Sequence, residues 1–260
     1  AMVCDFHAGG WDRHSRGTCP RESGERESTV RMRDMLAVNS DKRDQFYAYF
    51  ISQIQKISTL EAPPLYKKIL YVSIIDTLAQ ARHGRKDKQR FAKFVRICCG
   101  WKDIDKVSLI QLSHNLDCVL DDQEKKESKI LEFVNSQIGL FKEGSVYRVS
   151  DKDPFFTKVN LLAKFPQENR ALKHARHSAL IYSYRNTMIH NFREPGYGIE
   201  MSNDGSSPYY HSYMNRPWQM VYPVGFFESL CKTGLDGLME YLTNEDVDPY
   251  TQYRFGSMWT

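Results

Sequence analysis

The stretch Asn169–Phe192 reads NRALKHARHSALIYSYRNTMIHNF and is the longest helical pattern in this sequence of 260 residues. Neither Gly nor Pro interrupts it, and Pro195-Gly196 follows soon after its end. Apolar residues such as Leu172, Ala175 and Ala179 recur at intervals of three or four, which is the spacing of one helix face. The pattern therefore predicts one continuous helix over 169–192.

Helical patterns also lie on both sides of this stretch. Ser40-Asp41 can cap a helix whose apolar residues repeat every three or four positions as far as Ile57. Pro63-Pro64 and His83-Gly84 bound a second pattern, because Pro favours a helix start and Gly a helix end. We expect further helices at 88–99, 121–139 and 224–242, with a loop and a short helix over 101–115.

These elements predict an all-α fold, a bundle of about five to seven helices with a small loop or β-hairpin insertion after the 169–192 helix. The residues after Pro195 are dense in Gly, Asn, Ser, Pro and Tyr, which is typical of a structured loop or hairpin. We expect Tyr197–Met201 to pair with Gln219–Val221. The segment Val146–Val149 fits either a short strand or a loop.

Three segments differ in composition. Residues 1–39 are rich in Arg, Gly, Ser and Glu, and their early part has no apolar periodicity, so we expect a tag-like or disordered segment. Residues 40–245 contain the helical patterns and are expected to form the domain. Residues 246–260 are polar and aromatic and are expected to be a tail.

The overall composition is that of a globular cytoplasmic protein. Apolar residues make up 41% of the chain, and no apolar run is long enough to cross a membrane. No secretory signal is recognisable, and the six cysteines form no Cys-x-x-Cys pair. We expect free thiols, with Cys98-Cys99 buried rather than bound to a metal, and we expect no cofactor.

Positive charge is uneven along the chain, although the net charge is only +4. Between Arg82 and Lys106 nine Lys and Arg residues stand against three acidic residues. A second basic run extends from Lys164 to His177. The two runs are either binding sites for a polyanion or solvated helix faces.

Arg185 and His190 are the residues best suited to chemistry. A histidine exchanges a proton near neutral pH, and a guanidinium can hold two phosphate oxygens. Together they suffice for attack of an RNA 2′-hydroxyl on the adjacent phosphate, which needs no metal and leaves a 2′,3′-cyclic phosphate and a 5′-hydroxyl. Residues five apart on an ideal helix point about 140° from each other. The pair could therefore share one groove if the helix loosened near its end or if two copies converged.

The segment Arg185-Asn186-Thr187-Met188-Ile189-His190 resembles the motif of HEPN-type ribonucleases, in which Arg is followed by a polar residue, three further residues and His. Arg170 and His177 offer a competing pair, but Ala171 follows Arg170. The resemblance covers about residues 60–242. It implies an all-α, metal-independent endoribonuclease that acts as a homodimer, with the motif at the interface, in antiviral defence, toxin–antitoxin or RNA-processing systems. It also implies RNA as the partner and a regulatory or antitoxin protein.

The resemblance implies that His190 is the acid/base, Arg185 the phosphate clamp and Asn186 an orienting group. Phe192 stands where nucleotide-silenced toxins of this family carry Tyr, so that regulation is not expected here. We assign substrate binding to Arg90, Lys93, Arg193 and Tyr184, and treat Asp76 as a weaker candidate for a buried partner.

Other interpretations of the same residues remain open. His190 could be a helix-terminal histidine and Arg185 a surface ion-pair partner. The chain would then be a catalytically inactive helical module that binds RNA or protein. Aromatic residues after the motif either stack on bases or pack within their loop, and we favour packing. They are Tyr209, Tyr210, His211 and Tyr213.

Overall fold

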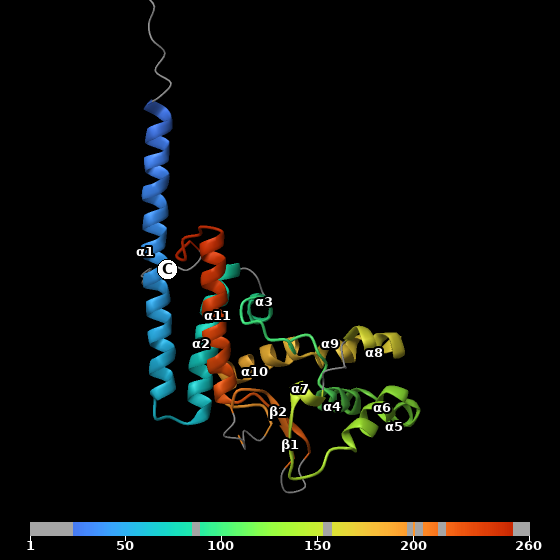
Figure 1. Cartoon of the computed structure of the whole chain (residues 1–260). Coiled ribbons are helices and arrows are strands. Elements are labelled where there is room, and N and C mark those ends of the chain that lie inside the picture. Colours follow the sequence, from blue (N-terminus) through green and yellow to red (C-terminus); the bar gives the residue numbers. More distant parts are fainter. Residues whose placement is uncertain are drawn as a thin grey trace, which may run out of the picture. The chain divides into compact units, whose positions relative to one another are not determined.

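The chain is mainly helical, as predicted, with one small antiparallel sheet in this computed structural model (Figure 1). The structure describes residues 23–84, 89–152, 158–196, 200, 205–212 and 217–251, and the side chains of 23–38, 152, 158–159 and 168–169 are outside that description. The chain divides into two units between Val38 and Asn39. The account of packing below concerns the second unit alone.

Helix α1 spans Ser23–Thr59 and begins earlier than the expected start at residue 41. Residues 23–39, which the sequence assigns to a tag-like or disordered segment, are helical, residues 1–22 lie outside the described part, and the chain divides next to the predicted boundary at residue 39. The apolar positions between 41 and 59 are buried as their spacing predicts. They are Phe46, Phe50, Ile54 and Ile57.

Helices α2 (Pro64–His83), α3 (Arg90–Ile97) and α11 (Val224–Asn244) build the main core with the second half of α1. The predicted ends of α2 are confirmed, and Gly84 adopts a φ of 76°, where glycine has no steric penalty. Helix α11 lies beside α2 and also packs on α3 (Figure 1). A Cβ atom at Gly237 would lie 2.3 Å from the Cys98 carbonyl oxygen, so glycine permits this close approach.

A second hydrophobic cluster is formed by α4 (Leu109–Val119), α6 (Lys129–Ile138), α8 (Lys158–Lys164) and α9 (Asn169–His174). The 310 turn Pro166–Glu168 joins α8 to α9. The single helix expected over 121–139 is wrong, because α5 (Asp122–Glu127) and α6 are separate. Ser128 leaves the helical conformation and its side chain caps α6 by accepting from the Leu131 N–H.

The motif helix is shorter than the sequence predicts. It divides into α9 and α10 (His177–Asn191), so the expectation of one helix over 169–192 is wrong. At the break, Arg176 forms a β-bridge with Val107, and the His177 N–H donates to the Lys106 carbonyl at 2.9 Å. These non-local hydrogen bonds replace helical ones and turn the chain between the two clusters.

The sheet has the order β1-β2-β3, with β1 at Val146–Arg148, β2 at Tyr209–His211 and β3 at Gln219–Val221. The open choice for 146–149 is settled as a strand followed by α7 (Val149–Lys152). Strand β3 pairs with β2, and the pairing of Gln219–Val221 with Tyr197–Met201 stays a prediction. Residues 197–199 and 201 of the expected partner lie outside the described part.

The beginning of the predicted tail is attached to the main core. Arg43 pairs with Asp246 at 2.8 Å and Lys42 with Asp248 at 2.6 Å, while Tyr250 packs against the core. Residues 246–251 are thus held by α1. The rest of the expected tail, 252–260, lies outside the described part.

Candidate functional site

The motif lies on the last two turns of α10, where part of the helix faces solvent. The helix stays regular through Asn191 and ends at Phe192, whose φ of 52° is left-handed. Loosening of the helix before His190 is therefore not seen. Tyr182, Asn186 and His190 recur every four residues and form one stripe, which we call the motif stripe. Tyr182 and His190 are exposed and Asn186 is half-buried.

The Arg185 side chain leaves the helix on a different side from His190, but its guanidinium contacts Asn186 of the motif stripe. Its Nη1 donates to the Asn186 Oδ1 at 2.8 Å, and its Nη2 donates to the Asp76 Oδ2 on α2. The Arg185 Nε is buried and finds no hydrogen-bond partner among the described residues. The guanidinium is therefore held by two oxygens, one of them on Asn186, which lies four residues, or about one helical turn, before His190.

Asp76 stands between two guanidiniums, one from each neighbouring helix. Arg185 contacts its Oδ2, and the Nη2 of Arg90 on α3 lies 3.4 Å from its Oδ1. The side chains of Asp76, Arg90 and Arg185 are 20%, 24% and 16% exposed. One carboxylate opposes two cations, so this group, which we call the Asp76 cluster, carries a formal charge of +1 beside the motif stripe.

A second charged group fixes the chain that follows the motif. Lys68 on α2 is fully buried and pairs with Glu194 at 2.7 Å and with Glu200 at 3.0 Å. The Tyr184 hydroxyl donates to the same Glu194 oxygen, Oε2. The Val224 N–H at the start of α11 donates to Glu200 Oε1 at 3.2 Å. This Lys68 cluster ties α2, α10 and the start of α11 together.

Tyr184 belongs to the core rather than to the solvent-facing side of α10. It is 4% exposed, and its ring packs on Tyr222 and Phe227. Burial, and then the Glu194 carboxylate, raise the pKa of Tyr184 well above its ordinary value. A residue assigned to substrate binding from the sequence therefore serves the packing of α10.

The other three residues that the sequence assigns to substrate binding differ in their exposure and in their distance along the chain from the motif. Arg90 belongs to the Asp76 cluster, Lys93 is half-buried one turn further along α3, and Arg193 is exposed three residues after His190. The competing His177 is fully buried, with its Nδ1 3.2 Å from the Tyr222 hydroxyl. Of the two Arg–His pairs, only Arg185–His190 thus has an exposed histidine.

The aromatic residues after the motif pack inside the protein. Tyr209, Tyr210 and His211 form β2 and are buried, which confirms the preference for packing, and Tyr213 lies outside the described part. The Tyr210 hydroxyl donates to Ser108 Oγ at 2.9 Å. These rings are not available to stack on a base.

The two basic runs meet in the tertiary structure. Arg96 on α3 donates twice to Asp105, and Arg176 lies 3.9 Å from the same carboxylate. The Arg96 guanidinium lowers the pKa of Asp105. The sequence showed the basic runs but carried no signal that Asp105 would lie between an arginine of each run, or that Asp76 would lie between Arg90 and Arg185.

Lys68 and its two glutamates were missed in the sequence. One signal was present, because Lys68 lies three and four residues before Tyr71 and Val72, which are on the buried face of α2. A lysine on a predicted core face needs a buried carboxylate. Nothing local identified Glu194 or Glu200 as that partner.

The buried cysteines behave as core residues. Cys98, Cys99 and Cys231 are free and buried, as the sequence predicts for the first two. Burial raises the pKa of Cys98 to about 11 and the pKa of Cys99 and of Cys231 well above the ordinary value. Protonated thiols are weak nucleophiles, so these residues do not suggest a cysteine-based site.

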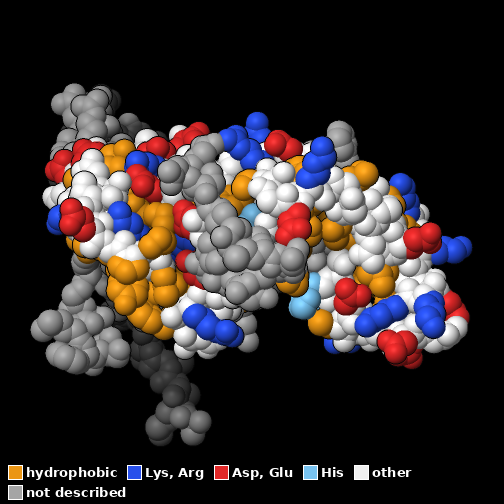
Figure 2. Space-filling model, turned by 90° about the horizontal axis from the view of Figure 1, so that it is seen from below, with side chains coloured by type: hydrophobic (Ala, Val, Ile, Leu, Met, Phe, Trp, Pro, Cys, Tyr) orange, Lys and Arg blue, Asp and Glu red, His pale blue; other side chains and the backbone are white. Residues whose placement is uncertain are grey.

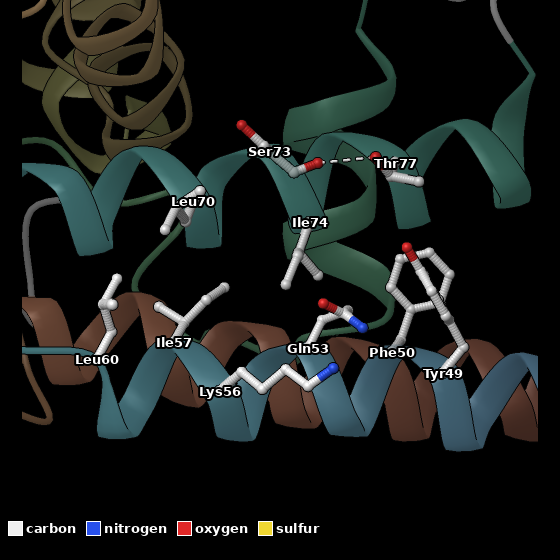
Figure 3. Close-up of a pocket in the computed structure, with 10 residues that line it drawn as sticks. All are labelled: Tyr49, Phe50, Gln53, Lys56, Ile57, Leu60, Leu70, Ser73, Ile74 and Thr77. Atoms are coloured by element: carbon white, nitrogen blue, oxygen red, sulfur yellow. Dashed lines mark hydrogen bonds between the residues drawn. The ribbon is translucent and has the colours of Figure 1, made fainter.

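An apolar groove of about 400 Å³ lies between α1 and α2, away from the titratable clusters. Figure 3 shows Leu70 and Ile74 of α2 facing Ile57 and Leu60 of α1 across it. Lys56 is the one ionisable cation in its lining. The groove offers apolar contact and no acid/base pair, so the candidate site is the motif stripe.

The surface in Figure 2 mixes charges of both signs. Where grey atoms leave it visible, hydrophobic side chains gather in one area, with Lys, Arg, Asp and Glu side chains interspersed around it. A continuous basic patch is not visible on this face. On this face, a polyanion would therefore be held by particular side chains rather than by a general positive field.

Comparison of the chain with protein-family models, with curated proteins and with solved structures found no match. The HEPN resemblance consequently rests on the motif residues alone. Within the described ranges, no helix has the length and apolar character needed to cross a membrane. In the same ranges, no three His, Cys, Asp or Glu side chains gather as metal ligands would.

Proposed function

We propose that this protein is a metal-independent endoribonuclease of the HEPN type that cleaves single-stranded RNA. One observation carries the proposal. The Arg185 guanidinium is held by Asp76 and by Asn186, which lies about one helical turn before the exposed His190. A preorganised cation and a solvent-accessible histidine can together catalyse attack of an RNA 2′-hydroxyl on the adjacent phosphate.

The reaction uses the 2′-hydroxyl of the RNA itself as the nucleophile. A neutral His190 accepts the proton of this hydroxyl while the 2′-oxygen bonds to phosphorus. Arg185 donates to the phosphoryl oxygens on which negative charge develops. The bond from phosphorus to the 5′-oxygen breaks, and a protonated histidine supplies a proton to that oxygen. The products are a 2′,3′-cyclic phosphate and a 5′-hydroxyl.

The need for both a base and an acid favours a homodimer. One chain places a single histidine on the motif stripe. Two chains that meet at the His190 end of α10 would supply two histidines, one neutral and one protonated, to the same phosphate and would leave Tyr182, two turns away, uncovered. The homodimer with the motif at its interface is therefore part of the proposal.

A second candidate function is supported by the same ion pair. Because Asp76 occupies Arg185 Nη2, the guanidinium already has a structural partner. An inactive helical module that binds RNA or protein would keep the Asp76 cluster for stability and would not need His190.

Cleavage of single-stranded RNA in excess chelator separates the two candidates. We expect wild type to leave 2′,3′-cyclic phosphate and 5′-hydroxyl ends. We expect His190→Ala and Arg185→Ala each to slow cleavage by about 100-fold or more, as removal of a general acid/base or an oxyanion donor does. His114→Ala is the matched control, because His114 is an exposed histidine on α4.

Three results are informative. Cleavage by His190→Ala at the wild-type rate would exclude the proposed mechanism. Wild type that binds RNA without cleaving it would favour the inactive module. Loss of activity on chelation would show that the reaction needs a metal.

A further inference from the structure

We infer that Tyr182 is a base-stacking subsite for an unpaired nucleotide close to the scissile phosphate. The inference rests on the proposed function, because it places RNA along the motif stripe, and it adds a contact that the motif does not contain. Three properties of Tyr182 carry it: its exposure, its position on the stripe and its charged neighbours.

Tyr182 is exposed although a buried aromatic side chain lies beside it. Its side chain is 39% exposed, whereas Phe91 of α3, 6.5 Å away between ring centroids, is 1% exposed. Tyr184, two residues later in α10, is buried and packs on Tyr222. Tyr182 therefore rests on Phe91 while much of its side chain remains open to solvent, where a base could stack.

The position of Tyr182 matches that of a nucleotide two or three positions from the reacting one. It lies eight residues before His190 on the same stripe, or about 12 Å along the axis at 1.5 Å per residue. Stacked nucleotides are about 3.4 Å apart and extended ones are further apart, so this span is on the order of two or three nucleotides. A base on Tyr182 would thus flank the cleaved bond without blocking His190.

The charged neighbours suit the backbone of the same strand. Arg185 lies three residues after Tyr182, and Arg90 precedes Phe91, the residue on which Tyr182 rests. Both guanidiniums belong to the Asp76 cluster and are partly exposed, at 24% for the Arg90 side chain and 16% for that of Arg185. Proteins that bind single-stranded nucleic acid often combine arginines with an exposed aromatic ring. The arginines contact the phosphates, and a base stacks on the ring.

Binding of RNA that cannot be cleaved tests the subsite independently of catalysis. The probe is a fluorescein-labelled single-stranded RNA in which every 2′-hydroxyl is methylated, and the readout is anisotropy with the full chain. We expect Tyr182→Ala to weaken binding roughly 5- to 100-fold, the range of one base–aromatic stack, and Tyr182→Phe to restore it. Tyr49→Ala is the control, because Tyr49 is 42% exposed on α1.

An abasic scan identifies the stacked base. A single abasic nucleotide moved along the probe should weaken wild-type binding at one position and have no further effect in Tyr182→Ala, since the two changes remove the same contact. Duplex RNA should bind both proteins equally. Tyr182→Ala that keeps its melting temperature and binds the probe within about twofold of wild type would overturn the inference.

The outcomes separate this inference from the proposed function. Loss of binding in Tyr182→Ala by a protein that does not cleave RNA would support the subsite and count against the nuclease. Cleavage of RNA with no dependence on Tyr182 would support the nuclease and count against the subsite. Failure of wild type to bind the probe would overturn the inference.

Discussion

Helix α2 carries two charged clusters of opposite composition, eight residues or about 12 Å apart. At Lys68 one fully buried ammonium lies between two carboxylates, and at Asp76 one half-buried carboxylate lies between two guanidiniums. Helix α10 reaches both, because Tyr184 faces the first and Arg185 the second. The comparison separates a structural site from one that can still bind a ligand.

The difference in burial has an energetic consequence. Buried charges must satisfy one another, and removal of a partner leaves an uncompensated charge in a medium of low dielectric. Charges near the surface are screened by water, so their pairing contributes little to stability. We therefore expect the Lys68 cluster to control folding and the Asp76 cluster to control activity.

Replacement of Lys68 should have the largest effect. Lys68→Ala leaves Glu194 and Glu200 without their cation, and we expect a loss of about 3–5 kcal/mol in the free energy of unfolding. Urea denaturation followed by circular dichroism measures it. Lys232→Ala is the control, because Lys232 is 49% exposed in its pair with Glu228 and should cost less than about 1 kcal/mol. Equal losses in the two variants would contradict the assignment.

Replacement of Asp76 should act mainly on the reaction. Asp76→Asn removes the charge that orients Arg185, and we expect kcat to fall by up to about 100-fold, with KM nearly unchanged, because positioning is lost rather than binding. Single-turnover and steady-state cleavage measurements give the effects on kcat and on KM separately. Asp105→Asn is the matched control, since Asp105 also lies between two arginines. A parallel change in kcat for both variants would show that the effect is general.

The smallest effect is expected at Asp105, the exposed counterpart of Asp76. Its pKa is lowered by Arg96, so the interaction stabilises the fold above the ordinary pKa of aspartate and is lost as pH falls through the lowered value. Arg96→Gln should raise the Asp105 pKa towards its ordinary value, which an NMR titration of the carboxyl group detects. The accompanying loss of stability should stay below about 1 kcal/mol, because the Asp105 side chain is 51% exposed. An unchanged titration would show that Arg96 does not hold this carboxylate.

Most helices were predictable because their signals are local. Pro63-Pro64 and Gly84 set the ends of α2, and the apolar spacing over 224–242 predicted α11. Two predicted helices were too long for different reasons. Ser128 provided a local cap within 121–139, whereas the break at Arg176 depends on pairing with Val107, which is distant in sequence. No periodicity within 169–192 indicates that pairing.

The sequence by itself determined the helical class of the fold and a motif near the end of a helix, because spacing and helix-ending residues act within a few positions. Only the tertiary structure decided what the motif side chains contact. Tyr184 and Arg185 are neighbours, yet one is drawn into the core by Glu194 and the other is held by Asp76 at the surface. Their partners come from other segments of the chain, and such contacts depend on packing between elements rather than on local pattern.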